Sequence, residues 1–342
     1  MPRNGPKKTA AREVVDFIVK QNPEAGARTI ARMVMAEHGD LFTSLEQCRD
    51  MVRCQLGIHG EHARKLAIDK TMFREPRKAG ERWQDVIPEA LVQVEGWGPF
   101  QIAGKQQTAV LSDIHLPFHS PMALEVTLNW IAAKNPTCIL INGDGADHYS
   151  CSRWVTDPSL RDFELEIQRV THFLKGLRKE WPKARIVYKW GNHEERYVIW
   201  LRTQAPNMIS VPNFQWEAIF ETEKYKVEVV KWKRPVRLGK INVFHGHEYP
   251  FAISNPVNPA RGLFLRAKVH AMCGHFHQSA NHSEKNAEEK VISTWSLGCL
   301  CDMHPEFRPL NNWNHGFAWV EHDDTDFQVE NFKIIDGKVF HT

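Results

Sequence analysis

Five short polar motifs hold the residues of this sequence that could do chemistry. They combine carboxylate, imidazole and amide side chains, and none of them contains a cysteine. In chain order the motifs are Asp113-Ile114-His115, Gly143-Asp144-Gly145-Ala146-Asp147, Gly191-Asn192-His193-Glu194, His245-Gly246-His247 and Gly274-His275-Phe276-His277. Oxygen and nitrogen donors of this kind suit borderline or hard divalent ions such as manganese, iron or zinc. The motifs therefore predict a metal site.

Each motif directly follows a short apolar run that is typical of a buried strand. The five runs are Thr108–Leu111, Cys138–Ile141, Ile186–Trp190, Lys240–Phe244 and Lys268–Cys273, and further strands are expected at Val291–Leu300, Phe317–Val320 and Phe327–Ile335. Helical stretches alternate with the apolar runs, so we expect an α/β arrangement with its site at the carboxyl ends of the strands. Glycines in the motifs allow the irregular backbone that would bring five strand ends to one point.

The residue types at the strand ends also indicate how a reaction would run. The two carboxylate oxygens of Asp144 could bridge two ions about 3.5–4 Å apart, which would hold a shared hydroxide and clamp phosphoryl oxygens. Attack on phosphorus then needs a proton for the leaving oxygen, and His193 is suited to supply it because imidazole titrates near neutral pH. Asp147 could fix the orientation of His193. These residues predict hydrolysis of a phosphate ester at a two-metal centre.

The order D-x-H, GD-x-x-D, GNHE, H, GHxH is similar to that of the calcineurin-like metallophosphoesterase superfamily over about residues 108–300. The resemblance implies a four-layer α-β-β-α sandwich and two divalent metal ions, with manganese expected first and iron, zinc or nickel as alternatives. It implies that one ion is held by Asp113, His115, Asp144 and His277, and the other by Asp144, Asn192, His245 and His275. It also implies that His193 is the proton donor and Asp147 its carboxylate partner.

Two positions separate the sequence from the protein serine/threonine phosphatase branch of that superfamily. That branch has arginine after the second aspartate of its GD motif, where this chain has His148, and a second glycine where this chain has His247. We therefore do not expect a protein phosphatase. With its helical N-terminal extension, the layout resembles phosphoesterases that bacteriophages and prophages encode.

Residues 1–60 are expected to form a small helical module. Apolar residues at helical spacing predict three short helices, which end before Pro23, at Gly39 and at Gly57. Thr43 and Glu46 have the spacing of a capping box at the start of the third helix. Three short helices with compact turns resemble a helix-turn-helix unit. Residues 61–105 are expected to be a linker with a β-ribbon near Ile87–Phe100, and residues 106–342 the metallophosphoesterase domain.

Basic residues of the helical module suggest a contact with DNA. Arg28 and Arg32 share one face of the second helix, and Arg49 and Arg53 share one face of the third. In a helix-turn-helix the later helix enters the major groove, and basic side chains neutralise phosphates. Residues 1–80 carry 15 Lys+Arg and 10 Asp+Glu, although the whole chain has a net charge of only +3. Solvated arginines on a protein-docking domain would give the same pattern.

Other residues could contact the substrate. Arg153 and Arg261 could grip a phosphate with paired hydrogen bonds, and His247 could line the cleft. Each also has a plainer interpretation, as a surface arginine in a salt bridge or as a residue that merely flanks a ligand. Trp190, Trp295 and Trp313 are expected in the core rather than as platforms for stacked bases.

Nucleic acid is the substrate that we expect, cleaved by a nuclease or phosphodiesterase activity, because a basic helical module would hold it near the metals. The alternatives are an enzyme for nucleotides or other small phosphate esters, and a DNA-binding regulator with an inactive metal domain. Seven scattered cysteines without a Cys-x-x-Cys pair indicate reduced thiols in a cytoplasmic protein, within the host if a phage encodes it. No signal peptide, membrane span or membrane partner is expected, and the oligomeric state is left open.

Overall fold

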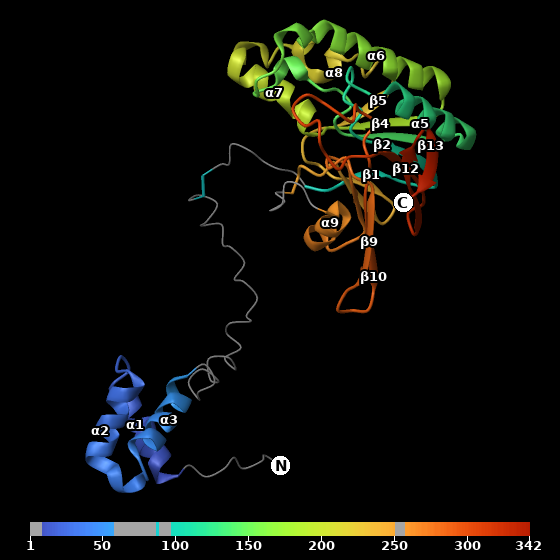
Figure 1. Cartoon of the computed structure of the whole chain (residues 1–342). Coiled ribbons are helices and arrows are strands. Elements are labelled where there is room, and N and C mark those ends of the chain that lie inside the picture. The colour runs from blue at the N-terminus through green and yellow to red at the C-terminus, as the bar shows by residue number, and fades with distance from the viewer. Residues whose placement is uncertain (1–8, 58–86, 89–96, 250–256) are drawn as a thin grey trace. The chain divides into compact units, whose positions relative to one another are not determined.

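The structure is a computed structural model of the chain, and it describes residues 9–57, 87–88, 97–249 and 257–342. The chain divides into two compact units, Met1–Gln93 and Val94–Thr342, which are coloured along the chain in Figure 1. Of the linker and ribbon expected at residues 61–105, residues 61–86 and 89–96 lie outside the described residues.

Helices form the first unit. They are α1 (Ala10–Gln21), α2 (Ala27–His38) and α3 (Leu45–Leu56), with a short 3-10 helix at Gly39–Leu41. Each helix contributes to one small apolar core, which includes Val15, Ile30 and Val52. Burial of these side chains is what stabilises helices of only three turns, because isolated helices of this length are marginal in water.

The cap of α3 differs from the predicted one. Ser44, not Thr43, is the N-cap, and its hydroxyl accepts a hydrogen bond from the backbone N–H of Gln47 at 3.2 Å. The Gln47 side chain in turn accepts from the backbone N–H of Thr43 at 2.7 Å. The predicted pair of Thr43 and Glu46 is therefore wrong by one residue, because Glu46 instead lies 3.0 Å from Arg49.

A seven-stranded sheet forms the first layer of strands in the second unit, in the order β13-β12-β11-β2-β3-β4-β5. Its parallel half consists of β2 (Gln106–Leu111), β3 (Cys138–Asn142), β4 (Arg185–Lys189) and β5 (Val227–Val230). Its antiparallel half consists of β11 (His315–His322), β12 (Phe327–Ile335) and β13 (Lys338–His341).

Helices cover one face of this sheet (Figure 1). They are α5 (Pro121–Lys134), α6 (Phe163–Glu180), α7 (Asn192–Gln204) and the short α8 (Trp216–Ile219). Short 3-10 helices lie between them at Tyr149–Cys151, Pro158–Leu160, Pro206–Met208 and Pro212–Phe214. Alternate residues of the parallel strands, such as Leu111, Ile141 and Tyr188, point into the core beneath the helices.

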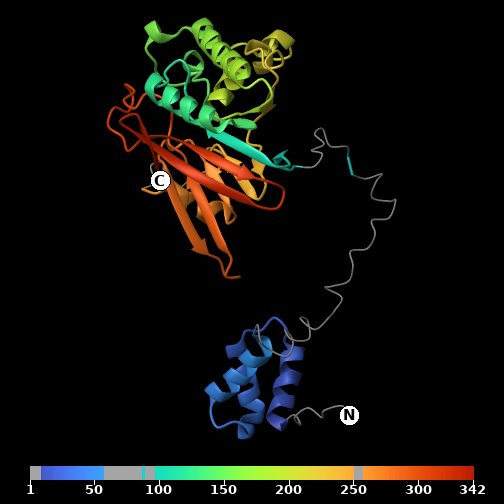
Figure 2. The same cartoon turned by 90° about the vertical axis from the view of Figure 1, so that its right-hand side faces the viewer.

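A second, six-stranded sheet packs on the other face, in the order β1-β6-β7-β8-β10-β9. Its strands are β1 (Phe100–Ile102), β6 (Val236–Leu238), β7 (Ile241–Phe244), β8 (Ala271–Cys273), β9 (Ala280–Lys285) and β10 (Val291–Ser296). The residues of opposite parity, such as Val110, Leu140 and Val187, fill the core between the two sheets with Val243 and Met272. Figure 2 shows the two sheets of this unit side by side.

Helix α9 (Pro259–Ala267) covers the outer face of the second sheet, where Leu263 packs with Phe244, Ala271 and Cys273. The layers are therefore helix, sheet, sheet and helix, which confirms the expected four-layer α-β-β-α sandwich. Strands β2, β3 and β4 are buried on both faces, and this explains why they appear in the sequence as continuous apolar runs rather than as alternating patterns.

All eight strands expected from the sequence form, with some boundaries shifted. The strand expected at Lys268–Cys273 begins only at Ala271, because Lys268 has a left-handed backbone and caps α9. Strands β5, β6, β9 and β13 are not indicated by the sequence. Strand β9 is a mostly exposed edge strand with few apolar residues, and β6 has three residues, so neither has a periodic signal to detect. Within the part of the chain that the structure describes, no helix is long and apolar enough to cross a membrane.

Candidate metal centre

The loops that carry the five motifs leave the carboxyl ends of β2, β3, β4, β7 and β8. Five motif residues other than glycine have positive φ angles, between 50° and 67°: Asp113, His115, Asp144, His275 and His277. A left-handed backbone is uncommon for residues other than glycine, and it concentrates at functional sites. The loops are thus shaped to aim side chains at one place rather than to continue regular structure.

Side chains from all five of these loops meet, with neighbouring polar atoms 3.1–3.9 Å apart. His245 Nε2 lies 3.1 Å from Asp144 Oδ2 and 3.1 Å from Asn192 Oδ1. His277 Nε2 lies 3.2 Å from Asp113 Oδ1, which is itself 3.9 Å from His245 Nε2. The structure therefore brings together residues that lie more than 160 positions apart in the sequence.

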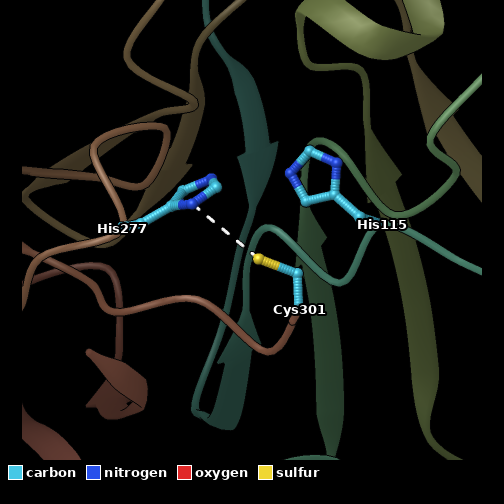
Figure 3. A group of neighbouring side chains, drawn as sticks. All are labelled: His115, His277 and Cys301. Carbon is cyan, nitrogen blue, oxygen red and sulfur yellow. Dashed lines mark hydrogen bonds between the residues drawn. The ribbon is translucent and has the colours of Figure 1, made fainter. Parts of the chain in front are cut away.

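Three groups of ligand atoms could each hold an ion, because the atoms of each group lie within 4.8 Å of one another. One group is His115, Asp144 and His193, and a second is Asp144, His245 and His275. Asp144 belongs to both, which is the position that a bridging carboxylate requires. The third group consists of His115, His277 and Cys301, drawn in Figure 3.

Individual nitrogen atoms also fit a bound ion. His115 Nε2 is buried without a hydrogen-bond partner, while its Nδ1 lies 2.8 Å from Asp147 Oδ2. His245 Nδ1 similarly lies 2.8 Å from the carbonyl oxygen of Asn142, which leaves Nε2 facing the carboxylates. A metal-binding histidine characteristically donates its other ring N–H to a carboxylate or carbonyl in this way. The unsatisfied nitrogen and the nitrogen and oxygen donors together fit a divalent ion.

His193 lies at the start of α7, beside Asp144. Its backbone N–H donates to Asp144 Oδ1 at 2.9 Å, and its Nε2 is 3.7 Å from Asp144 Oδ2. Its Nδ1 lies 2.7 Å from the carbonyl oxygen of Asp147. A carbonyl can only accept, so Nδ1 carries a proton and Nε2 faces the site.

The carboxylate of Asp147 is shared between two histidines. Its Oδ2 lies 2.8 Å from His115 Nδ1 and 3.4 Å from His193 Nδ1. The contact expected between the Asp147 side chain and His193 is therefore the longer of the two. His193 Nδ1 instead donates its hydrogen bond to the backbone carbonyl of Asp147. Asp147 orients His193 mainly through its backbone and His115 through its side chain.

The charges of the site balance one another. Burial raises the pKa of Asp113, Asp144 and Asp147, but the neighbouring histidines outweigh burial and hold the pKa of all three below its usual value. Burial lowers the pKa of His245, but Asp144 and Asp113 raise it to about 10. Burial and the charge of His245 lower the pKa of His275 to about 3. Imidazolium groups thus stabilise the buried carboxylates, a task that a metal cation can take over.

Glu194 holds two motifs together and is fully buried. Its carboxylate accepts hydrogen bonds from the backbone N–H groups of Asp144 at 3.0 Å, Gly145 at 3.0 Å and Gly191 at 2.7 Å. The hydroxyl of Tyr188 donates to it at 2.7 Å. Glu194 therefore fixes the loop of Asp144 on the first turn of α7.

A buried ion pair supports the loop of His245. Lys189 Nζ lies 2.7 Å from Glu248 Oε1, and both side chains are buried. Glu248 also accepts from the backbone N–H groups of His245 at 2.9 Å and Gly246 at 2.6 Å. Burial raises the pKa of Glu248, but Lys189, His247 and His245 together outweigh burial and lower the pKa to about 2. Sequence reasoning missed this pair, for which Glu248 directly after the H-G-H motif was the available signal.

Of the three residues expected to contact substrate, His247 lies beside the candidate ligands, whereas the two arginines do not contact them among the described residues. The Arg153 guanidinium lies over the Trp154 ring at 4.9 Å, and both residues are exposed. Arg261 is exposed at the start of α9, on the outer layer. Among the described residues, neither arginine forms a hydrogen bond or ion pair with the side chains that could hold a metal. His247 lies beside His245, with ring centroids 5.3 Å apart, and its Nε2 is 3.0 Å from Glu195 Oε1.

A cation that the sequence reasoning missed does lie near the centre. Arg196 Nη1 is 3.4 Å from the carbonyl oxygen of Asp147 and 3.9 Å from its carboxylate. Its side chain keeps 26% of its surface exposed. Arg196 comes four residues after Asn192, one helical turn along α7, and this spacing was the signal that could have identified it.

An aromatic loop flanks His277. The Trp313 and His277 rings are 4.2 Å apart between centroids, and the Phe307 ring is 6.3 Å from Trp313. Trp313 is only partly buried and Phe307 is 82% exposed. Asn311 orders the loop by donating to the carbonyl oxygens of Met303 and Arg308. Trp190 is buried as expected, whereas Trp313 lies at the edge of the site.

The arginines of the helical unit differ in their surroundings. Arg49 lies 3.0 Å from Glu46, and Arg53 lies 3.4 Å from Asp50. Arg28 and Arg32 are exposed on α2. Acidic residues thus offset the positive charge of α3, and α2 carries the more accessible basic pair.

No protein-family model matches the sequence. The gene 54 protein of Mycobacterium phage L5 is 25% identical over 246 residues, which cover 68% of this chain and 95% of the phage protein. The gene 54 protein of Mycobacterium phage D29 has the same identity and coverage. This chain is thus similar to phage proteins over most of their length.

Three solved structures are similar to the chain at low scores. Vps29 of Cryptosporidium parvum is 12% identical with a TM-score of 0.40, over 70% of this chain and 96% of that one. Vps29 of Entamoeba histolytica complexed with zinc is 13% identical with a TM-score of 0.37, over 69% and 97%. The phosphoesterase YfcE of E. coli is 15% identical with a TM-score of 0.34, over 69% and 98%.

Gly274 packs against Asp113, a candidate ligand, and replacing it should weaken metal binding. A Cβ at Gly274 would clash with Ser112 Oγ and stand 2.5 Å from Asp113 Oδ2, so both side chains would have to move. Displaced ligand-orienting groups typically reduce metal affinity by about 10- to 100-fold. We expect Gly274→Ala to reduce Mn²⁺ affinity by about that factor in isothermal titration calorimetry.

Gly176→Ala is the matched control for this change. Gly176 lies inside α6 at an exposed position, and a Cβ there meets nothing within 4 Å. Because nothing is displaced, this variant should bind the metal with unchanged affinity. Alanine is favoured over glycine in a helix interior by about 0.5–1 kcal/mol, so its melting temperature should be slightly higher. Equal affinities of the Gly274→Ala chain and the unmodified chain would contradict the packing argument.

Proposed function

We propose that this chain is a metal-dependent phosphoesterase with two divalent ions. The observation that supports it is the membership of Asp144 in two ligand groups at the carboxyl ends of the strands. One ion would be held by Asp113, His115, Asp144 and His277, and the other by Asp144, Asn192, His245 and His275. Manganese is the first candidate, with iron, zinc or nickel as alternatives. Bound divalent ions would polarise the phosphoryl group and supply an activated water at neutral pH.

His193 is the group that would protonate the leaving oxygen. Its Nδ1 proton is donated to the carbonyl oxygen of Asp147, which holds the ring with Nε2 toward Asp144. A proton carried on Nε2 would therefore lie on the side of the ring that faces the site. Arg196, partly exposed beside Asp147, would add positive charge for the incoming phosphate.

Nucleic acid is the substrate class that we propose, cleaved in the cytoplasm of a phage host. Two features support it. The Trp313 ring offers an apolar face next to His277, the Phe307 ring lies beside Trp313, and unpaired bases stack on such rings. Arg28 and Arg32 give the helical unit an exposed basic face, which we propose contacts DNA phosphates in the manner of a helix-turn-helix module.

Loss of the Asp144 charge should remove the activity. Asp144→Asn keeps the shape of the side chain but weakens its hold on both ions, whose charge stabilisation is worth several kcal/mol in the transition state. We expect turnover to fall by about three orders of magnitude. Initial rates would be measured with Mn²⁺ on single-stranded DNA, duplex DNA, RNA, a cyclic nucleotide and an aryl phosphodiester.

Asp336→Asn is the matched control, because Asp336 lies exposed in the turn between β12 and β13. Asparagine tolerates the positive φ of 49° there. Unchanged turnover of the Asp144→Asn chain on every substrate would refute the bridging assignment. Activity on the cyclic nucleotide alone would favour a nucleotide phosphoesterase over a nuclease.

Replacement of His193 should reduce turnover by an amount that depends on the leaving group of the substrate. General acids typically contribute about 10²- to 10⁴-fold, and they matter most when the departing oxygen is strongly basic. We expect His193→Gln to slow hydrolysis of a nucleoside or alkyl ester far more than that of a nitrophenyl ester. The check is a plot of log kcat against the leaving-group pKa for both proteins. Parallel plots would count against His193 as the proton donor.

The exposed arginines of α2 should govern DNA binding. Each phosphate contact contributes about −0.9 to the slope of log affinity against log salt concentration. Loss of two contacts should therefore make the slope shallower by about two in Arg28→Ala/Arg32→Ala. Arg49→Ala/Arg53→Ala is the control, with a smaller change because Glu46 and Asp50 already pair with these side chains. Salt-independent binding of duplex DNA by the full chain would exclude the proposed contact.

A further inference from the structure

Cys301 lies at the metal centre although it belongs to none of the five motifs. It follows β10 and is 4% exposed, and its Sγ is 3.8 Å from His277 Nδ1. In Figure 3 its thiol points toward the space between the imidazole rings of His115 and His277. One ligand atom from each of these three residues lies within 4.8 Å of those of the other two.

The neighbouring histidines supply a second, independent indication of a ligand. His115 Nε2 is buried without a hydrogen-bond partner, so its lone pair is available to a metal ion. The rings of His115 and His277 are 5.3 Å apart between centroids. A buried imidazole nitrogen and a buried sulfur at this separation are both donors that bind zinc and similar ions.

The backbone of Cys301 is held in place from two sides. His315 Nε2 lies 2.9 Å from its carbonyl oxygen, and an isolated β-bridge joins Cys301 to His119. Residues from β11 and from the loop after β2 therefore position the thiol. These backbone contacts fix the position of Cys301 beside His277.

We propose that Cys301 is a further ligand of the ion that we assign to Asp113, His115, Asp144 and His277, so that one of the two metal positions contains a thiolate. Thiolate ligands favour zinc and other soft or borderline ions, whereas sites of carboxylates and water suit manganese and magnesium. A thiolate would therefore shift the preference of this one position from the Mn²⁺ proposed for the centre toward Zn²⁺, Fe²⁺ or Co²⁺. The other position, which has no cysteine in its ligand group, keeps the harder donor set.

Coordination of Cys301 requires the loss of its proton. The hydrogen bond with Cys299 and burial raise the pKa of the Cys301 thiol well above its usual value. A coordinated thiol is deprotonated outright by the charge of the ion. The S–H bond therefore breaks as the sulfur–metal bond forms, and the proton leaves to solvent.

A different role for Cys301 is to orient His277 by a hydrogen bond to Nδ1. In that case the sulfur would not touch the ion. The two roles differ in one observable, which is electronic contact between sulfur and metal. This assignment concerns metal binding alone, so it stands or falls independently of phosphoesterase activity.

Cobalt absorption tests the assignment on the full chain. The metal-free protein is titrated with Co²⁺, and a thiolate ligand gives an intense near-ultraviolet charge-transfer band. We expect this band in the unmodified chain and in Cys138→Ser, a buried cysteine of the core between the sheets. We expect Cys301→Ser to lose the band while its visible cobalt bands show that the ion still binds.

Two results would overturn the proposal: no charge-transfer band in the unmodified chain, or a band retained in Cys301→Ser. Circular dichroism checks that each variant folds. Should Cys301→Ser fail to fold, ¹¹³Cd NMR of the unmodified chain decides instead. A cadmium resonance in the range of sulfur-containing sites supports the thiolate, and one in the range of oxygen and nitrogen sites alone refutes it.

Discussion

The centre depends on the hydrogen bonds that the buried carboxylate of Glu194 accepts from the backbone. The loop of Asp144 has left the sheet with a positive φ, so its backbone N–H groups have no strand to donate to. Buried N–H groups need acceptors, and one carboxylate with two oxygens can serve several of them. Glu194 does this for Asp144, Gly145 and Gly191 while lying in the first turn of α7, where the helix dipole favours a negative charge.

The site contains several buried carboxylates, and neighbouring groups must compensate their negative charge. Asp113 and Asp144 are buried beside His245, and Glu248 is buried beside Lys189. Isolated carboxylates in such surroundings would be strongly destabilising. Each of these carboxylates is tolerated because a cationic side chain or a hydrogen-bond donor lies next to it. The same balance that permits folding therefore prepares the ligands for a divalent metal.

The donors around the centre are not uniform. Asp144, His245 and His275 form a set of oxygen and nitrogen atoms, whereas Cys301 adds sulfur beside His115 and His277. A thiolate at one position would let the two positions differ in metal preference. Trp313, which packs with Phe307, lies against the same histidine that Cys301 contacts, His277. The segment that follows β10 thus supplies two residues beyond the five motifs for which we propose a role, through the thiol of Cys301 and the ring of Trp313.

The sequence by itself determined the strands and the order of the motifs, because strand burial and turn glycines leave local patterns. Val110, Leu140 and Val187 belong to apolar runs that are readable without a structure, and the polar residues after them mark the strand ends. Short or exposed strands such as β6 and β9 leave no such pattern. Only the tertiary structure decided which side chains touch, since loop paths and strand order depend on pairings between distant segments.

Particular residues show the difference. Asp147 was predictable as part of a motif, but its division between His115 and His193 depends on how two loops meet. Arg153 follows the second motif in sequence, yet its side chain lies over Trp154. Cys301 is remote from every motif and reaches His277 because β10 pairs with β8 and the chain then turns back to the site. Local chemistry is written in the sequence, and proximity between remote segments arises only when the sheets assemble.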